Sequence, residues 1–251
     1  MKTQATKEYV SRFGDHKTTY VLVHGSWYGS WSWKRVRSML QNAGHDVFTP
    51  TLTGLGERSH LNSPAIDLST HIADIVNLIR WEELSDVVLC GHSYSGCVIS
   101  GVADQIPENI RALVYLDAFV LEDGECLFDL FPEQVSHPMR QQAETIGDGW
   151  KLPPIPARAF NVNRQDLAWA DAQVTPQSIA CFEELIRLVG DRDQIRDVTH
   201  ILATGFDNSA VTPSHERARM KGWKTLTMES GHMVMLDRPT ELVELLLEYS
   251  R

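Results

Sequence analysis

The chain has 251 residues, 43% hydrophobic and 22% charged, and its 33 acidic against 23 basic residues leave a formal net charge of −10. This composition is typical of a globular protein with one large or two smaller domains, and it excludes a disordered chain. The acidic balance argues against nucleic acid and anionic membranes as partners, and no apolar run approaches the roughly 20 residues of a membrane span.

Residues 1–16 are polar, and we expect them to form a flexible N-terminal extension. Because this start lacks the apolar core of a signal peptide, we expect a cytoplasmic protein. The four cysteines have no CxxC spacing and the ten histidines include no HExxH, so no metal site is predicted.

Short apolar runs alternate with stretches of helical periodicity along most of the chain. The runs that predict strands are Thr19–His24, Asp46–Thr49, Asp86–Cys90, Ile110–Leu116, His200–Thr204 and Lys224–Met228. The stretches that predict helices between and after them are Trp31–Ala43, Ser69–Trp81, Tyr94–Gln105, Ser214–Lys221 and Pro239–Tyr249. This alternation predicts an α/β fold with a mostly parallel central sheet and helices on both faces.

The alternation is interrupted between residues 118 and 196. This stretch has no comparable buried strand and holds six of the eleven prolines, with helices expected near Leu127–Phe131 and Pro176–Val189. We therefore expect a helical cap inserted at 118–196 into a core formed by 17–117 and 197–251. In open α/β sheets ligands bind beyond the carboxyl ends of the strands, so chemistry is expected there.

The strongest local signal is Gly91-His92-Ser93-Tyr94-Ser95-Gly96, which follows an apolar strand and opens a helix. A serine on such a strand-to-helix turn projects above the sheet as a nucleophile, and the small neighbours make the strained turn feasible. The sequence departs from the usual G-x-S-x-G pattern, because Ser95 stands where the second glycine is expected.

Two further strand ends supply partners for Ser93. Gly25 lets the chain turn sharply after the first long strand, so the backbone N–H of Ser26 can join that of Tyr94 as an oxyanion hole. His232 follows the last strand after a small residue, and it is the candidate base that Ser93 needs at neutral pH.

A carboxylate must hold the base in one tautomer, and two aspartates follow strands. Asp207 comes after HILATGF and Asp117 after ALVYL, and the chain order Ser, Asp, His holds for either. We favour Asp207, because this fold usually places its acid after the penultimate strand, and we keep Asp117 as the alternative.

From Thr19 to Tyr249 the chain resembles the α/β-hydrolase superfamily, in its small-esterase and hydroxynitrile-lyase-like branch, which includes plant methyl-salicylate esterases. The segments VLVHGSWYGSW, TPTLTGLGERSH, VVLCGHSYSG and SGHMVML carry this resemblance. It implies a Ser-His-acid triad, a cap over the pocket and no cofactor. The acid does not carry over cleanly, since GFDNSA matches the family's acid loop only with a slip of one residue.

The resemblance leaves three functions open. Hydrolysis of a small, largely apolar or aromatic carboxylic ester is favoured, because hydroxynitrile lyases of this branch typically carry Thr at the position of Gly25 and Lys at that of Met233. The alternatives are such a lyase and a ligand receptor on the same framework. The expected substrate contacts are Gly25, Trp27, Phe128, Trp150 and Met233. The expected partner is a small-molecule ester, with no nucleic acid and no membrane, and a homodimer is left open.

Overall fold

The computed structural model describes residues 17–206 and 209–250, and its centre is a six-stranded sheet in the order β2-β1-β3-β4-β7-β8. Each neighbouring pair of strands in this sheet is parallel. The strands are β1 (Thr19–Val23), β2 (Asp46–Phe48), β3 (Val87–His92), β4 (Ile110–Leu116), β7 (Asp197–Ala203) and β8 (Lys224–Met228). All six predicted strands are therefore present, and the predicted parallel α/β architecture is confirmed.

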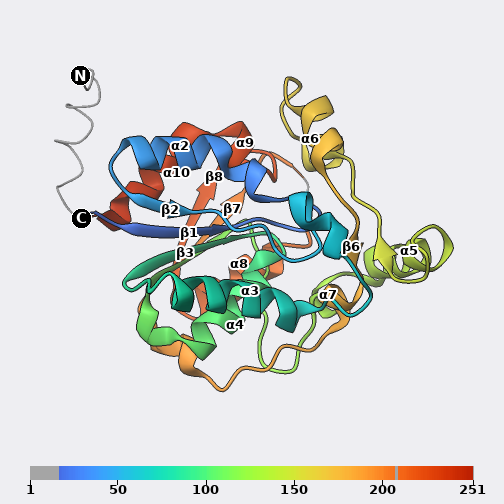
Figure 1. The fold of residues 1–251 in the computed structure, drawn as a ribbon, viewed down its shortest axis with the longest axis horizontal. Coiled ribbons are helices and arrows are strands. Elements are labelled where there is room, and N and C mark those ends of the chain that lie inside the picture. Colours follow the sequence, from blue (N-terminus) through green and yellow to red (C-terminus); the bar gives the residue numbers. More distant parts are fainter. Residues whose placement is uncertain (1–16, 207–208, 251) are drawn as a thin grey trace.

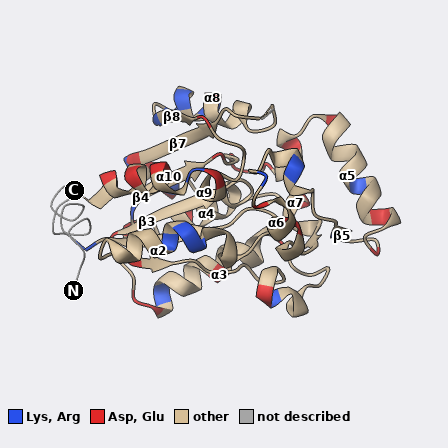
Figure 2. Cartoon of the chain, turned by 90° about the horizontal axis from the view of Figure 1, so that it is seen from above, with Lys and Arg blue, Asp and Glu red and all other residues tan. Residues whose placement is uncertain are grey.

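Burial explains why the central strands read as continuous apolar runs. Every residue of β3 is buried, and so are all but one of the residues of β4 and of β1, because helices cover both faces of the sheet. The edge strand β2 is only half-buried. Figure 2 shows acidic and basic residues interspersed over the helices and loops, whereas β3 carries no charged residue.

Helices cover the two faces of the sheet as separate layers (Figure 1). α2 (Lys34–Asn42) and α10 (Pro239–Leu246) pack together on one face, and α3 (Leu68–Trp81) and α4 (Ser95–Gln105) pack together on the other, where α8 (Thr212–Met220) also lies. The remaining short elements of this core are η1 (Ser30–Trp33), η2 (Gly56–Leu61), η3 (Pro107–Asn109), α9 (Val234–Asp237) and η7 (Leu247–Ser250). No helix among the described residues has the length and apolar character needed to cross a membrane.

Between β4 and β7 the chain leaves the sheet, and α5, α6 and α7 of this segment lie at one edge of the molecule (Figure 1). In chain order the elements of this segment are η4 (Leu127–Leu130), α5 (Glu133–Thr145), β5 (Lys151–Leu152), η5 (Ala157–Phe160), α6 (Leu167–Gln173), β6 (Gln177–Ser178), α7 (Ala180–Glu183) and η6 (Asp191–Gln194). The division at residues 118 and 196 and the role of this segment as a cap stay predictions. The predicted extension at 1–16 lies outside the described residues.

The helix predicted over Pro176–Val189 is wrong. Gln177 and Ser178 pair antiparallel with β5, and α7 then lasts for only four residues. Beyond it the backbone of Ile186 exchanges hydrogen bonds with Gly124 and Glu125, at 2.9 and 2.8 Å. These strand-like contacts take the amide groups that a longer helix would use, so tertiary pairing overrides the apolar periodicity of the segment.

Candidate active site

Ser93 lies on a sharp turn between β3 and α4. Its φ of +56° is in the left-handed region, which non-glycine residues seldom adopt. Side chains at the two flanking glycines would collide with backbone, because a Cβ at Gly91 would lie 2.5 Å from the Ser95 carbonyl oxygen and one at Gly96 would lie 2.1 Å from that of Phe119. The two glycines therefore allow the strained turn that carries the Ser93 hydroxyl beyond the sheet.

Three side chains from three strand ends form a continuous hydrogen-bonded relay. The Nδ1 of His232 lies 2.6 Å from the Oδ2 of Asp117, and its Nε2 lies 2.9 Å from the Oγ of Ser93. Because the carboxylate accepts the Nδ1 proton, the Nε2 is left as the acceptor for the Ser93 hydroxyl proton. This geometry equips Ser93 to act as a nucleophile with His232 as its base.

Asp117 is fully buried directly after β4. Its φ of +45° turns the chain sharply, and its second carboxylate oxygen accepts the Ala203 N–H at 2.9 Å. The carboxylate is thereby fixed toward His232. Asp207, the acid that the sequence favours, lies outside the described residues, so the structure gives the contact of Asp117 alone.

The backbone of His232 is held on both sides. Its N–H donates to the Phe160 carbonyl oxygen at 2.9 Å, and its own carbonyl accepts from the Nε2 of His92, also at 2.9 Å. Burial, followed by the nearby His232, holds the pKa of His92 well below its usual value, so this ring stays neutral. Sequence reasoning assigned no role to His92, although it lies inside the Gly91–Gly96 motif.

Two backbone N–H groups, those of Ser26 and Tyr94, belong to residues at the same end of the sheet as Ser93. Within the described residues, neither the Ser26 N–H nor the Tyr94 N–H donates to another protein group. The Tyr94 hydroxyl is fixed by the Nδ1 of His71 at 2.8 Å. The loop that carries Ser26 passes close to Ser93, because a Cβ at Gly25 would lie 2.9 Å from the Ser93 Cβ. This pair of donors is suited to a developing oxyanion.

A cavity of about 240 Å³ opens onto Ser93 and His232. Its other lining residues, mostly apolar and drawn from the core and from the segment between β4 and β7, are Ser26, Trp27, Phe119, Leu127, Phe131, Val135, Met139, Ile155, Ala159, Phe160, Phe182, Phe206, Ala210 and Val211. Such walls fit an apolar ligand group whose reactive end reaches the hydroxyl.

Among the five predicted substrate contacts, Trp27 lines this cavity and the other four do not. Phe128 is buried behind the wall, against the lining rings of Phe131 and Phe182. Trp150 packs under the Lys151 ammonium, 4.9 Å from the ring centre, and Met233 is buried at the start of α9. Gly25 is not part of the cavity wall, but its backbone passes close to Ser93.

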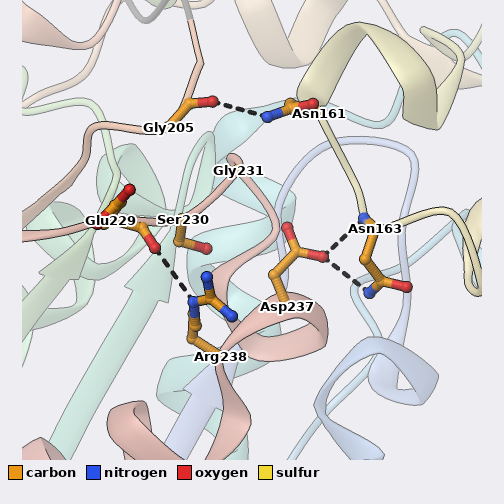
Figure 3. Close-up of a pocket in the computed structure, with 8 residues that line it drawn as sticks. All are labelled: Asn161, Asn163, Gly205, Glu229, Ser230, Gly231, Asp237 and Arg238. Carbon is orange, nitrogen blue, oxygen red and sulfur yellow. Dashed lines mark hydrogen bonds between the residues drawn. The ribbon is translucent and has the colours of Figure 1, made fainter.

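A second cavity of about 260 Å³ is lined by Glu229, Ser230 and Gly231, the residues that precede His232 in the chain (Figure 3). Three pairs of consecutive residues separate the two cavities, with Phe160, Phe206 and His232 on the apolar side and Asn161, Gly205 and Gly231 on the polar side.

Hydrogen bonds across the polar cavity tie the segment around Asn161 to the core. Asn161 donates to the Gly205 carbonyl at 2.7 Å, and both the backbone and the side-chain amide of Asn163 donate to Asp237, each at 2.9 Å (Figure 3). These contacts fix the wall on which the base packs. Among the described residues, no group of three or more His, Cys, Asp or Glu side chains is arranged to hold a metal ion.

Comparison with known proteins places these features in a family. A sequence profile described as "Alpha/beta hydrolase family" matches residues 20–245. A carbendazim-hydrolysing esterase from Nocardioides sp. (strain SG-4G) is 41% identical over 238 residues, covering 90% of this chain and 96% of the relative. Methyl jasmonate esterase 1 of Vitis vinifera is 24% identical, covering 91% of this chain and 95% of its own. An extracellular alpha/beta-hydrolase from a Paenibacillus species superposes with a TM-score of 0.80 at 23% identity, covering 93% of this chain and 99% of the other.

Proposed function

Since the chain belongs to the alpha/beta hydrolase family, we propose that it hydrolyses carboxylic esters through an acyl-enzyme formed on Ser93. The observation that carries this proposal is the relay from Asp117 through His232 to Ser93, with contacts of 2.6 and 2.9 Å, at the base of an apolar cavity. The similarity to the Nocardioides esterase supports ester hydrolysis independently.

In the proposed first half-reaction the Ser93 oxygen attacks the ester carbonyl carbon while its proton moves to the Nε2 of His232. The carbonyl oxygen becomes an oxyanion that accepts hydrogen bonds from the Ser26 and Tyr94 N–H groups. The tetrahedral intermediate collapses, the C–O bond to the alcohol breaks, and His232 returns the proton to the leaving oxygen.

In the second half-reaction a water molecule attacks the acyl carbon of the Ser93 ester. His232 takes a proton from this water, the same two N–H groups hold the new oxyanion, and the bond between the acyl carbon and the Ser93 oxygen breaks. The protonated His232 restores the serine hydroxyl, and the carboxylic acid leaves. Throughout, Asp117 stabilises the imidazolium and keeps the Nδ1 proton in place.

The close approach at Gly25 argues against the lyase alternative. The cyanohydrin-cleaving relatives typically carry threonine at this position, but here a Cβ at Gly25 would meet the His92 Nδ1 at 2.8 Å and the Ser93 Cβ at 2.9 Å. A threonine therefore does not fit without a shift of the loop. Purified protein is expected to cleave an aryl acetate and to release no cyanide from mandelonitrile, and faster cyanide release would reverse this ranking.

The cavity supports a small, largely apolar or aromatic ester as the substrate. Two esters of equal length test this, p-nitrophenyl butyrate and the p-nitrophenyl monoester of succinate, because the second carries a carboxylate that would be desolvated between apolar walls. We expect the butyrate to have the higher kcat/KM by at least tenfold, and equal rates would contradict the proposed class. Carbendazim is a further compound to assay, since a relative at 41% identity is named for its hydrolysis.

A further inference from the structure

The loop that carries the Ser26 N–H contains a glycine for steric reasons. A Cβ at Gly25 would lie 2.8 Å from the His92 Nδ1 and 2.9 Å from the Ser93 Cβ, so the backbone can pass over Ser93 only without a side chain. Glycine also has the largest conformational freedom of any residue. An oxyanion donor next to a glycine is therefore preorganised only if other groups restrain the two peptides that meet there.

The first restraint on these peptides is a pair of hydrogen bonds made by the His24 ring. The Gly25 carbonyl accepts from the Nδ1 of His24 at 2.8 Å, and the Nε2 of the same ring accepts the Leu52 N–H at 3.0 Å. Because the trans peptide is planar, its N–H points opposite to its C=O, so a fixed Gly25 carbonyl aims the Ser26 N–H away from His24. Burial lowers the pKa of His24 to about 4, which keeps this ring neutral and its roles as donor and acceptor constant.

The second restraint comes from Ser95, at the start of α4. Its hydroxyl donates to the carbonyl oxygen of His24, which belongs to the peptide on the other side of Gly25. Ser95 is fully buried, two residues after the nucleophile, at the position where the usual G-x-S-x-G pattern has glycine. One side chain thus links the turn of Ser93 to the loop of Ser26.

We propose that Ser95 is a positioning residue for the oxyanion hole, holding the Ser26 N–H in line with Ser93 through its hydrogen bond to the His24 carbonyl. This inference rests on the proposed ester hydrolysis, and it concerns how the transition state is held rather than which ester is bound. Sequence alone gave the Ser95 side chain only the property of being small enough for the turn.

The expected loss of kcat on removal of the Ser95 hydroxyl has an upper and a lower limit. Complete loss of one oxyanion donor lowers kcat by roughly 10²–10³-fold, whereas one neutral hydrogen bond contributes a factor of roughly two to ten. Removal of the Ser95 hydroxyl leaves the Ser26 N–H present but less well aimed. We therefore expect Ser95→Ala to lower kcat about three- to tenfold and to leave KM within about twofold. We expect Ser95→Gly to lower kcat by at least the same factor, because glycine adds backbone freedom to the turn.

The experiment measures kcat and KM on an aryl acetate, together with the affinity for an aryl trifluoromethyl ketone. This ketone adds to the Ser93 oxygen and places a negative oxygen at the oxyanion position. Ser100→Ala is the control, since Ser100 is also a fully buried serine of α4, but its hydroxyl donates to the Gly96 carbonyl at 2.8 Å and lies 2.9 Å from the Tyr115 hydroxyl, with no hydrogen bond to the loop of Ser26. Melting temperatures are recorded for all variants.

Ketone affinity should fall in parallel with kcat for Ser95→Ala, while Ser100→Ala lowers the melting temperature without changing kcat or ketone affinity per folded molecule. If Ser95→Ala loses stability but keeps the wild-type kcat and the wild-type ketone affinity, the proposal is overturned and Ser95 is a packing residue. Failure of the proposed function has a different signature, namely ester turnover that is equal in wild type and Ser93→Ala. In that case the ketone affinity is also equal in wild type and Ser93→Ala, and the role assigned to Ser95 falls together with the proposed function.

Discussion

At the scale of single residues, the carboxylate that orients His232 is the most informative member of the relay. The 2.6 Å contact to the His232 Nδ1 favours Asp117, although its position in the chain is the less common one. Asp117→Asn keeps the shape but cannot stabilise the imidazolium, so we expect a loss on the order of 10⁴ in kcat, as the same change produces in serine proteases. The measurement is steady-state kinetics on an aryl ester, corrected for the folded fraction.

Asp207→Asn is the matched variant, because Asp207 is the acid that the sequence favours. We expect its kcat to stay within about threefold of wild type, as is usual for a residue outside the reacting groups. The reverse pattern, with the large loss in Asp207→Asn, would assign the acid to Asp207.

The sequence predicts Ser93 as the nucleophile and His232 as the base and favours Asp207 as the acid, whereas the structure places Asp117 against His232. The sequence could not predict this contact of Asp117, and the reason is physical. A nucleophile turn needs small residues at fixed offsets, and these glycines are visible as a local pattern. The direction of the Asp117 carboxylate depends instead on its left-handed backbone and on the hydrogen bond from Ala203, which lies on another strand. No local pattern records such a tertiary contact.

Gly25 gives a second prediction at this scale. Gly25→Ala places a Cβ within 2.9 Å of the Ser93 Cβ, so either the loop or Ser93 must shift. We expect kcat to fall by about 10²-fold, comparable to the loss of an oxyanion donor. Gly222→Ala is the control, since its φ of +74° strains a side chain but nothing lies within 4 Å, so it should lower stability alone. Normal kcat in Gly25→Ala would refute the close approach.

At the scale of elements, the segment between η5 and α6 is anchored to the core by Asp237. The carboxylate accepts twice from Asn163, and nearby Phe160 contacts His232 through its carbonyl and its ring. Asp237→Ala releases this anchor and loosens the cavity wall. We expect KM for an apolar ester to rise about threefold or more, with a smaller change in kcat.

Asp123→Ala controls for the loss of a carboxylate contact in general, because Asp123 accepts the Leu188 N–H at 2.9 Å and does not line the cavity. This variant should leave KM unchanged. An equal rise of KM in both variants would indicate general loosening of the fold rather than a specific anchor.

An element can be predicted from the sequence where local patterns determine it, and cannot where tertiary contacts do. The four inner strands β1, β3, β4 and β7 are mostly buried between the helices on the two faces, so their apolar runs are readable from the chain. Between residues 118 and 196 the elements other than α5 are short, and tertiary contacts determine where they form. α5 was not predicted because it contains Pro138, which normally interrupts a helix, and the helix expected at 176–189 was displaced by strand pairing.

At the scale of the whole molecule, buried histidines make stability depend on pH. Burial lowers the pKa of His24 and of His200 to about 4, whereas both titrate near 6.5 when the chain unfolds. The unfolded state therefore binds more protons than the folded state as the pH falls below 6.5. The stabilisation is fully present above that pH and is lost progressively toward pH 4.

Urea unfolding between pH 7.5 and 5.5 tests this, because histidines titrate in that window and carboxylates scarcely do. We expect the free energy of unfolding to fall by about 1 kcal/mol for each of these two histidines at pH 5.5. His60→Gln changes an exposed histidine, and we expect its free energy of unfolding to fall with pH as steeply as that of the wild type. A free energy of unfolding that is constant across this window would contradict the buried, neutral state of the two rings.

The central claim is that an ester passes through a covalent intermediate on Ser93. The most direct measurement is rapid-quench mass spectrometry of the protein mixed with excess p-nitrophenyl acetate, with peptide mapping of any added acetyl group. We expect a burst of p-nitrophenol, acetylation at Ser93, and accumulation of that species when its hydrolysis is slowed in Asp117→Asn. Turnover that continues in Ser93→Ala at the wild-type rate, with no acetyl group on the peptide that carries residue 93, would contradict the account.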